Sequence, residues 1–249
     1  MIRALLWDVD GTLAETERDG HLVAFNRAFA TAGVPWRWSA AHYGRLLEIA
    51  GGYERLLYDM QHRDEAPAAA AGRESLARQL HQLKNGFYED IVRSGELPLR
   101  AGVPGLLAEC AAARLPMAIA TTTTPGNVAA LLERHLGGDW RGRFAAVVTA
   151  AEAPRKKPEP QVYRLALGLL GLAPHEAVAI EDAPAGVEAC RRAGVPVIVA
   201  HSHYFPTLAV GAVVRAAGPS LGSGAGWRPS AETPAARIGL EQLRRWSGG

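Results

Sequence analysis

Short apolar runs alternate with amphipathic segments over most of the chain. Five runs have the length and composition of buried strands, at residues 2–8, 117–121, 144–150, 177–181 and 196–200. Segments with helical periodicity and Gly or Pro at their boundaries lie between the later runs, at residues 102–115, 126–136, 159–170 and 185–194. This alternation predicts an α/β fold in which helices cover both faces of a parallel sheet.

One long stretch, residues 16–96, breaks the alternation. It has helical segments at 21–33, 41–61 and 72–95, with a loop expected at 66–72 and no run that resembles a strand. We therefore expect a helical domain of residues 16–96, inserted after the first strand. The sheet domain is then discontinuous, with residues 1–15 and 97–249.

The C-terminal part has a different composition. Residues 218–234 are rich in Gly, Pro and Ser, which predicts a surface loop or a partly disordered segment. A last helix is expected at about 235–247, packed back on the sheet domain.

Composition narrows the class of protein. The chain has 249 residues, of which 48% are hydrophobic, enough for a substantial core. Its net charge is +2 and its basic residues are scattered, which argues against a nucleic-acid partner. Cys110 and Cys190 lie in Ala-rich helical segments, so we expect buried thiols and a reducing compartment. Without a signal-like start or a transmembrane run, we expect a cytoplasmic monomer with no membrane partner.

Polar residues that could carry chemistry follow four of the predicted strands: Asp8 with Asp10, the threonines Thr121, Thr122 and Thr123, Lys157, and Glu181 with Asp182. Each group alone has an ordinary structural interpretation, such as a polar turn, a threonine-rich strand end, a solvated basic turn or a helix N-cap. A calcium loop starting at Asp8 is excluded, because Leu13 stands where that loop needs glycine.

Together the four groups are more informative than any one of them. In a doubly wound sheet the carboxyl ends of the strands converge on one cleft. A nucleophilic carboxylate, a hydroxyl that binds anions, a lysine and a pair of acids would meet there. The combination suits phosphoryl transfer, which needs a nucleophile and neutralisation of the phosphoryl charge.

With these motifs the sequence resembles the haloacid dehalogenase (HAD) superfamily, which has a Rossmann-like core. The matching motifs are DVDGT from Asp8, the threonine run, Lys157 and the acidic pair, and the inserted helices match the C1-type cap. DVDGTLAETE, GVPWRW, GGYER, ATTT and KKPEPQVY further resemble CbbY-type sugar-phosphate phosphatases, with β-phosphoglucomutase as a close relative.

The resemblance implies a role for each core residue. Asp8 would be the nucleophile that forms an aspartyl-phosphate, and Asp10 would protonate the leaving oxygen and then activate water. Thr121 would hold phosphoryl oxygens and Lys157 would supply a positive charge. The expected cofactor, Mg²⁺, would be held by Asp8, the Asp10 backbone carbonyl and Asp182, with Glu181 as an outer or water-mediated contact.

The cap would read the sugar. Its candidate substrate-binding residues are Thr16, Glu17, His21, Arg55 and Lys84, together with Thr122 and Thr123 in the core, although the helix charges could equally be ordinary solvated ones. Three positions depart from the family pattern. ETERDGH has one residue more than expected before His21, Tyr53 stands where a lysine is common, and Ala183 replaces a serine.

The leading hypothesis is a Mg²⁺-dependent phosphatase for a small phosphorylated sugar. The resemblance implies a pentulose bisphosphate such as xylulose 1,5-bisphosphate. The alternative is a phosphomutase of the β-phosphoglucomutase type, which uses the same core. An inactive binding protein on this scaffold is disfavoured because every core motif is present, and a dehalogenase is disfavoured because it would not need Asp182.

Overall fold

The computed structural model describes residues 2–207 and 211–248. Within them one sheet of six parallel strands has the order β3-β2-β1-β4-β5-β6. The strands are β1 (Ala4–Trp7), β2 (Met117–Ala120), β3 (Ala146–Val148), β4 (Ala177–Glu181), β5 (Val197–Ala200) and β6 (Val214–Gly218). After β1 the chain adds β2 and β3 on one side of it, and then β4, β5 and β6 on the other side. The strand order therefore reverses between β1 and β4.

The sheet confirms the predicted α/β fold class. The five predicted strands are all present, most of them shorter at their ends than the apolar runs. The sixth strand, β6, was missed. Its sequence is VRAAG, in which an exposed arginine interrupts the apolar residues, and it lies at the edge of the sheet.

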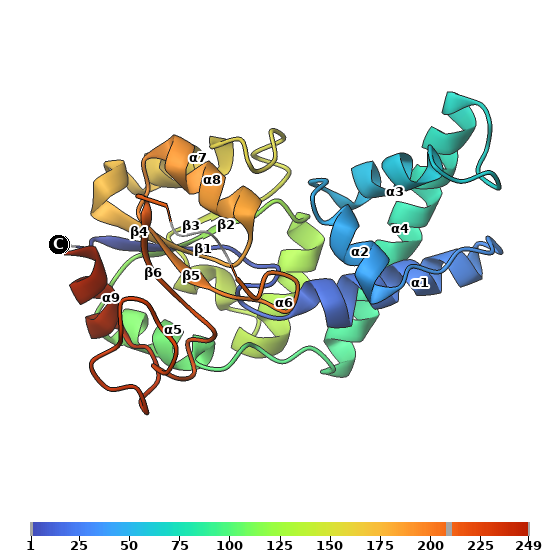
Figure 1. Cartoon of the computed structure of the whole chain (residues 1–249). Helices are drawn as coiled ribbons and strands as arrows, with labels where there is room; N and C mark the ends of the chain where they lie inside the picture. The colour runs from blue at the N-terminus through green and yellow to red at the C-terminus, as the bar shows by residue number, and fades with distance from the viewer. Residues whose placement is uncertain (1, 208–210, 249) are drawn as a thin grey trace.

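Alternate side chains of β1 face opposite layers of helices. Leu5 and Trp7 pack with α5 (Val103–Ala112), α6 (Pro125–Leu136) and α9 (Leu240–Ser247). Ala4 and Leu6 pack with the second layer, which consists of α7 (Gln161–Leu170) and α8 (Pro184–Ala193). Figure 1 shows these two layers above and below the sheet. All four residues of β1 are buried, as expected for a central strand of a parallel sheet.

Helices alone connect β1 to α5. They are the π-helical turn η1 (Glu17–His21), α1 (Leu22–Thr31), α2 (Ala40–Leu46), α3 (Gly52–Met60) and α4 (Ala70–Ser94). They have their own aromatic core, which includes Phe25, Phe29, Trp36, Trp38 and Tyr43. Figure 1 shows them beyond one end of the sheet. We call residues 16–96 the cap, and its boundaries stay a prediction.

Two connections join the cap to the sheet domain. The outgoing chain at Ala14 pairs with the returning chain at Leu99. Arg100 donates to the carbonyl oxygens of Gly11, Ala200 and His201, so the returning segment is tied to the ends of β1 and β5. The loop expected at 66–72 lies earlier than predicted, because α3 ends at Met60 and α4 begins at Ala70.

The Gly, Pro and Ser-rich segment at 218–234 is irregular, as predicted, but it is not simply a surface loop. Trp227 is buried and its ring stacks on Trp246, with 4.9 Å between ring centroids. Its indole N–H donates to the carbonyls of Ser220 (3.0 Å) and Ser223 (2.9 Å). The last helix, α9, starts later than the predicted residue 235.

Two remaining expectations concern thiols and membranes. Cys110 and Cys190 are free and buried, as predicted. Across residues 2–207 and 211–248, every helix is too short or too polar to pass through a bilayer.

Core packing gives the first prediction. Leu6→Ala removes a fully buried side chain from the central strand, and we expect it to lower the free energy of unfolding by roughly 2–5 kcal/mol. Leu169→Ala is the matched control, because Leu169 is 67% exposed on α7 and should change stability by about 0.5 kcal/mol or less. Chemical denaturation measures both, and similar losses would contradict the assignment of Leu6 to the core.

Candidate active site

The first two acids lie where β1 ends. The Asp8 backbone N–H donates to Ile180 in β4 (3.1 Å), which continues the sheet for one more residue. The chain then turns through Gly11, whose φ of +82° favours glycine, and the backbone N–H groups of Thr12 and Leu13 both donate to Val9. This turn directs Asp8 and Asp10 into the same cavity.

Lys157 joins this strand end to β4. Its Nζ donates to Asp8 Oδ1 (2.6 Å) and to Glu181 Oε1 (2.7 Å). Glu181 also accepts from the Tyr163 hydroxyl and, on its other oxygen, from the Asp182 backbone N–H (3.2 Å). Both oxygens of Glu181 are therefore engaged within the protein. Its carboxylate orients Lys157 toward Asp8.

Three carboxylates lie close together at this point of the site. Asp8, Glu181 and Asp182 each have an oxygen within 4.8 Å of the others, and all three are buried. Burial raises the pKa of Asp8 to about 7, although the Lys157 ammonium lowers it. Burial and the charges of Asp8 and Glu181 raise the pKa of Asp182 well above its usual range. Full ionisation of Asp8 at neutral pH therefore requires more positive charge than Lys157 supplies.

Asp10 has a different environment. Its Oδ1 accepts from the Thr16 hydroxyl (2.7 Å) and lies 3.0 Å from His21 Nε2. Burial alone would raise the pKa of Asp10, but His21 and Thr16 together lower it to about 2. Two carboxyls only two residues apart therefore have pKa values that differ strongly, as expected for groups with separate tasks.

The extra residue before His21 has a structural consequence. Residues Glu17–His21 form a π-helical turn, and the Leu22 N–H donates to the Glu17 carbonyl. A π turn is how a helix accommodates one inserted residue without losing its register on either side. His21 consequently still reaches Asp10, and its ring stacks on Tyr88 with 4.2 Å between centroids.

The threonine run ends β2 and starts α6, as predicted. Thr124 caps the helix, accepting from the Asn127 N–H at 3.4 Å. The buried Thr121 hydroxyl accepts from the Thr123 N–H (3.2 Å), and Thr123 accepts from the Asn127 side chain (3.0 Å). Thr122 and Thr123 line the cavity at the helix N-terminus, a position that favours anions.

The cap supplies two cations to this region, a partly buried arginine and a buried lysine. Arg55 lies 3.4 Å from Glu17 and donates to the Tyr43 hydroxyl (3.1 Å), which itself donates to Glu17 (2.5 Å). Lys84 has its Nζ 5.4 Å from the Phe25 ring centre, and burial lowers its pKa to about 8. A lysine with a lowered pKa keeps its charge at neutral pH and gains from an anionic partner.

These side chains surround a cavity with two lobes. The larger lobe, about 320 Å³, is lined by Asp8, Lys157, Glu181 and Asp182. The smaller lobe, about 90 Å³, is lined by His21, Lys84, Thr123 and others. Both lobes share Asp10, Glu17, Arg55 and Thr122. Of the sequence-predicted site residues, Thr16 and Thr121 lie just outside the lining, each hydrogen-bonded to a residue that forms it.

Sequence reasoning missed several lining residues. His81 and Lys156 face the smaller lobe, and Phe205 faces the larger one. Lys156 pairs with Glu54 of the cap at 2.5 Å, so it connects the two parts of the chain. The double lysine at 156–157 was a usable signal for Lys156. His81, one turn before Lys84 on α4, had a weaker one, and Phe205 had none.

Comparison with known proteins agrees with this geometry. A family model described as haloacid dehalogenase-like hydrolase matches residues 2–194. The protein CbbY, plasmid, of Cupriavidus necator is 48% identical over 198 residues, which cover 80% of this chain and 78% of that protein. Thermotoga maritima has a relative named phosphorylated carbohydrates phosphatase, 27% identical over 205 residues, 81% of this chain and 87% of that protein.

Two solved structures match this chain over almost its whole length. CbbY from Rhodobacter sphaeroides in complex with xylulose-(1,5)-bisphosphate is 34% identical, with a TM-score of 0.83, covering 98% of this chain and 99% of that one. A β-phosphoglucomutase from Clostridium difficile has a TM-score of 0.72 at 16% identity, covering 100% and 98%, and shares the fold. The chain therefore belongs to the haloacid dehalogenase-like hydrolase family.

Proposed function

We propose that this protein is a Mg²⁺-dependent phosphatase for a small phosphorylated sugar, with a pentulose bisphosphate such as xylulose 1,5-bisphosphate as substrate. The two-lobed cavity carries the proposal. One lobe holds a carboxylate nucleophile, a lysine and further acids, and the other holds cationic side chains. One phosphate would react in the first lobe while the second binds in the other.

The acidic cluster fits a hard divalent cation. Asp8 and Asp182 offer buried carboxylate oxygens, and of the three clustered carboxylates Lys157 pairs with Asp8 and Glu181. Oxygen ligands of this kind suit Mg²⁺, and the Asp10 backbone carbonyl is the proposed third protein ligand. Glu181 is an outer contact in this arrangement, because its oxygens already accept from Lys157, Tyr163 and Asp182. When bound, Mg²⁺ supplies positive charge between the nucleophile and the phosphoryl oxygens.

Different residues of the chain then have different roles in the reaction. Asp8 attacks phosphorus, and the bond between phosphorus and the sugar oxygen breaks, which leaves an aspartyl-phosphate. Lys157 neutralises charge on the transferring group, while Thr121 and the backbone N–H groups at the start of α6 hold its oxygens. Water then attacks the same phosphorus, releasing inorganic phosphate and regenerating Asp8.

Asp10 is the proton-handling group. His21 and Thr16 favour its ionised form, so Asp10 is ready to accept a proton from the attacking water in the second step. In the first step it would need a proton to give to the leaving sugar oxygen. That proton is available only when substrate binding weakens the contacts of Asp10 with His21 and Thr16.

The residues that line the smaller lobe suit the second phosphate of a bisphosphate substrate. Arg55, Lys84, Lys156 and His81 line it, and Glu17 is paired with Arg55 and Tyr43. The similarity to CbbY from Rhodobacter sphaeroides, whose complex contains xylulose-(1,5)-bisphosphate, supports the same substrate class here. Tyr53, which replaces a common lysine, lies in this lobe, where Lys84 and Lys156 supply positive charge.

A phosphate-release screen over sugar mono- and bisphosphates with and without Mg²⁺ tests the proposal. We expect release that requires Mg²⁺ and favours a pentulose bisphosphate over monophosphates. Activity that depends on a bisphosphate primer, with a sugar phosphate isomer as product, would instead identify the phosphomutase alternative. No turnover of any phosphate ester would contradict both.

Asp8→Asn is the first test of the mechanism. The amide cannot attack phosphorus, so we expect kcat to fall by at least about 10³-fold. Thermal unfolding should show a folded protein, because Glu181 still pairs with Lys157. Mass spectrometry of acid-quenched wild-type enzyme should find a phosphoryl group on Asp8, and appreciable activity of the variant would exclude this nucleophile.

Arg55→Ala tests the second lobe. Loss of a charge-assisted contact should lower kcat/KM for a bisphosphate by roughly 10- to 100-fold, but that for p-nitrophenyl phosphate by about threefold or less. The control is Arg78→Ala, since Arg78 is an exposed arginine of the same cap. Equal losses on the two substrates would remove Arg55 from the specificity residues.

Gly11→Ala tests the position of Asp182. Its Cβ would lie 2.2 Å from Asp182 Oδ2, so we expect Mg²⁺ affinity to weaken by about 10-fold or more, measured by titration. Gly171→Ala is the matched control. It has a similar left-handed φ of +64°, and within the described residues nothing lies within 4 Å of its new Cβ. Both variants should lose about 1–2 kcal/mol from the backbone, so equal Mg²⁺ affinity would refute the contact.

A further inference from the structure

The segment that follows β5 leaves the sheet domain and touches the cap. Tyr204 and Phe205 pack against the aromatic core of the cap helices. The Tyr204 ring meets the Tyr43 ring nearly edge-on, with 5.9 Å between centroids and 66° between planes. It also faces Gly44 of α2, where a Cβ would lie 3.1 Å from Tyr204 Cδ1. Gly44 thus leaves the space that the tyrosine ring occupies.

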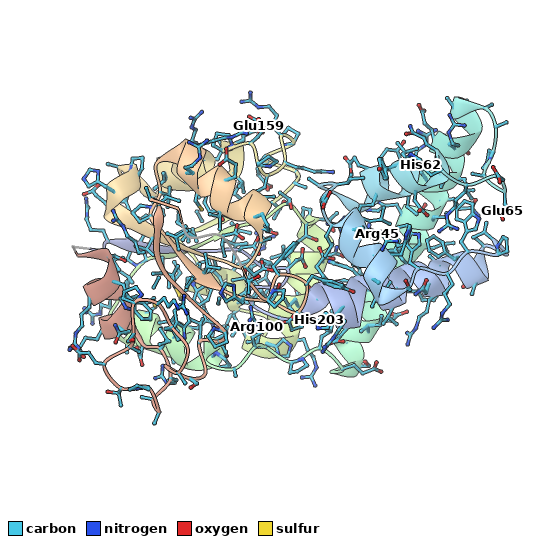
Figure 2. The ribbon with its side chains drawn as sticks, viewed as in Figure 1. Arg45, His62, Glu65, Arg100, Glu159 and His203 are labelled. Carbon is cyan, nitrogen blue, oxygen red and sulfur yellow. The ribbon has the colours of Figure 1, made fainter. Side chains whose placement is uncertain are left out.

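The same segment is fixed beside the connection into the cap. The His203 backbone N–H donates to Glu15 Oε2 (3.2 Å), and its ring nitrogen Nδ1 lies 3.3 Å from Arg18 Nη1. Figure 2 shows His203 at the boundary between the sheet domain and the cap helices, with Arg45 on α2 beyond it. Tyr204 is therefore held from the core side while its ring contacts the cap.

The contact between Tyr204 and Tyr43 is linked to side chains that line the cavity. Tyr43, which receives the Tyr204 ring, donates its hydroxyl to Glu17 (2.5 Å) and accepts from Arg55 (3.1 Å). Glu17 and Arg55 line both lobes of the cavity. Phe205, the next residue, lines the larger lobe. A shift of Tyr43 would therefore move the side chains that face the distal part of a substrate.

We propose that Tyr204 is a positioning residue that seats the cap on the core and fixes the Tyr43–Glu17–Arg55 group over the substrate. The inference rests on the proposed phosphatase function. The ring, rather than the hydroxyl, makes the contact, because the buried Tyr204 hydroxyl has no hydrogen-bond partner in the described part of the chain. An aromatic ring suits this task, since it buries a large area with few rotatable bonds.

Two variants of Tyr204 test the inference in the full-length enzyme. Tyr204→Ala should lower kcat/KM for xylulose 1,5-bisphosphate by about 10- to 100-fold, because small misplacements in a site have large effects on rate. Its kcat/KM for p-nitrophenyl phosphate, which is too short to need the cap, should change by about threefold or less. Tyr204→Phe should retain wild-type values on both substrates.

Hydrogen–deuterium exchange gives a readout that does not depend on turnover. Tyr204→Ala should raise exchange in α2 (residues 40–46) and leave the central strands unchanged, while Tyr204→Phe should not. Tyr58→Ala is the control, since Tyr58 is an exposed tyrosine of α3. Gly44→Leu should reproduce the Tyr204→Ala effects, because the leucine side chain would fill the space of the Tyr204 ring.

The outcomes separate the two proposals. If the wild type hydrolyses neither substrate, the proposed function fails, and the exchange of α2 still decides whether Tyr204 seats the cap. If the wild type is active, equal losses on both substrates, unchanged exchange in α2, or a Phe variant as impaired as the Ala variant would each overturn the role of Tyr204.

Discussion

The arrangement of the whole site depends on one buried ammonium group. Lys157 donates to Asp8 and Glu181, residues that follow or end two different strands, and lies 149 positions from Asp8 in the chain. With all three clustered carboxylates ionised, the single charge of Lys157 would leave an excess of negative charge, which burial makes costly. A divalent cation would neutralise this excess, and an anionic phosphoryl group could then bind beside it.

A second set of contacts, both polar and aromatic, holds the cap on the sheet domain. Asp10 is bonded to Thr16 and His21 at the start of the cap, Glu54 pairs with Lys156, and Tyr204 packs on Tyr43. These contacts lie around the same cavity. The proposed proton-handling residue is thus also a residue that contacts the cap, so the proposed function would couple substrate binding to cap position.

The backbone of the segment ETERDGH keeps His21 in contact with the site residue Asp10. One residue more in ETERDGH than the expected family pattern would rotate the following helix by about 100° if it were added to a regular α-helix. The π turn at Glu17–His21 takes up the insertion instead, so His21 keeps its contact with Asp10. Tyr53 stands where the expected family pattern has a lysine, and Lys84 and Lys156 line the same lobe.

The sequence alone determined the order of elements and the residues at strand ends. Apolar runs and Gly or Pro boundaries are local signals, so β1 to β5 and the positions of Asp8, Thr121, Lys157 and Asp182 could be predicted. Only the tertiary structure decided the rest. Edge strand β6, buried Trp227 and the contact of Tyr204 with Gly44 join residues distant in sequence, and no local pattern encodes which distant partner a side chain meets. The different pKa values of Asp8 and Asp10 have the same origin, because burial and neighbouring charges exist only in the folded chain.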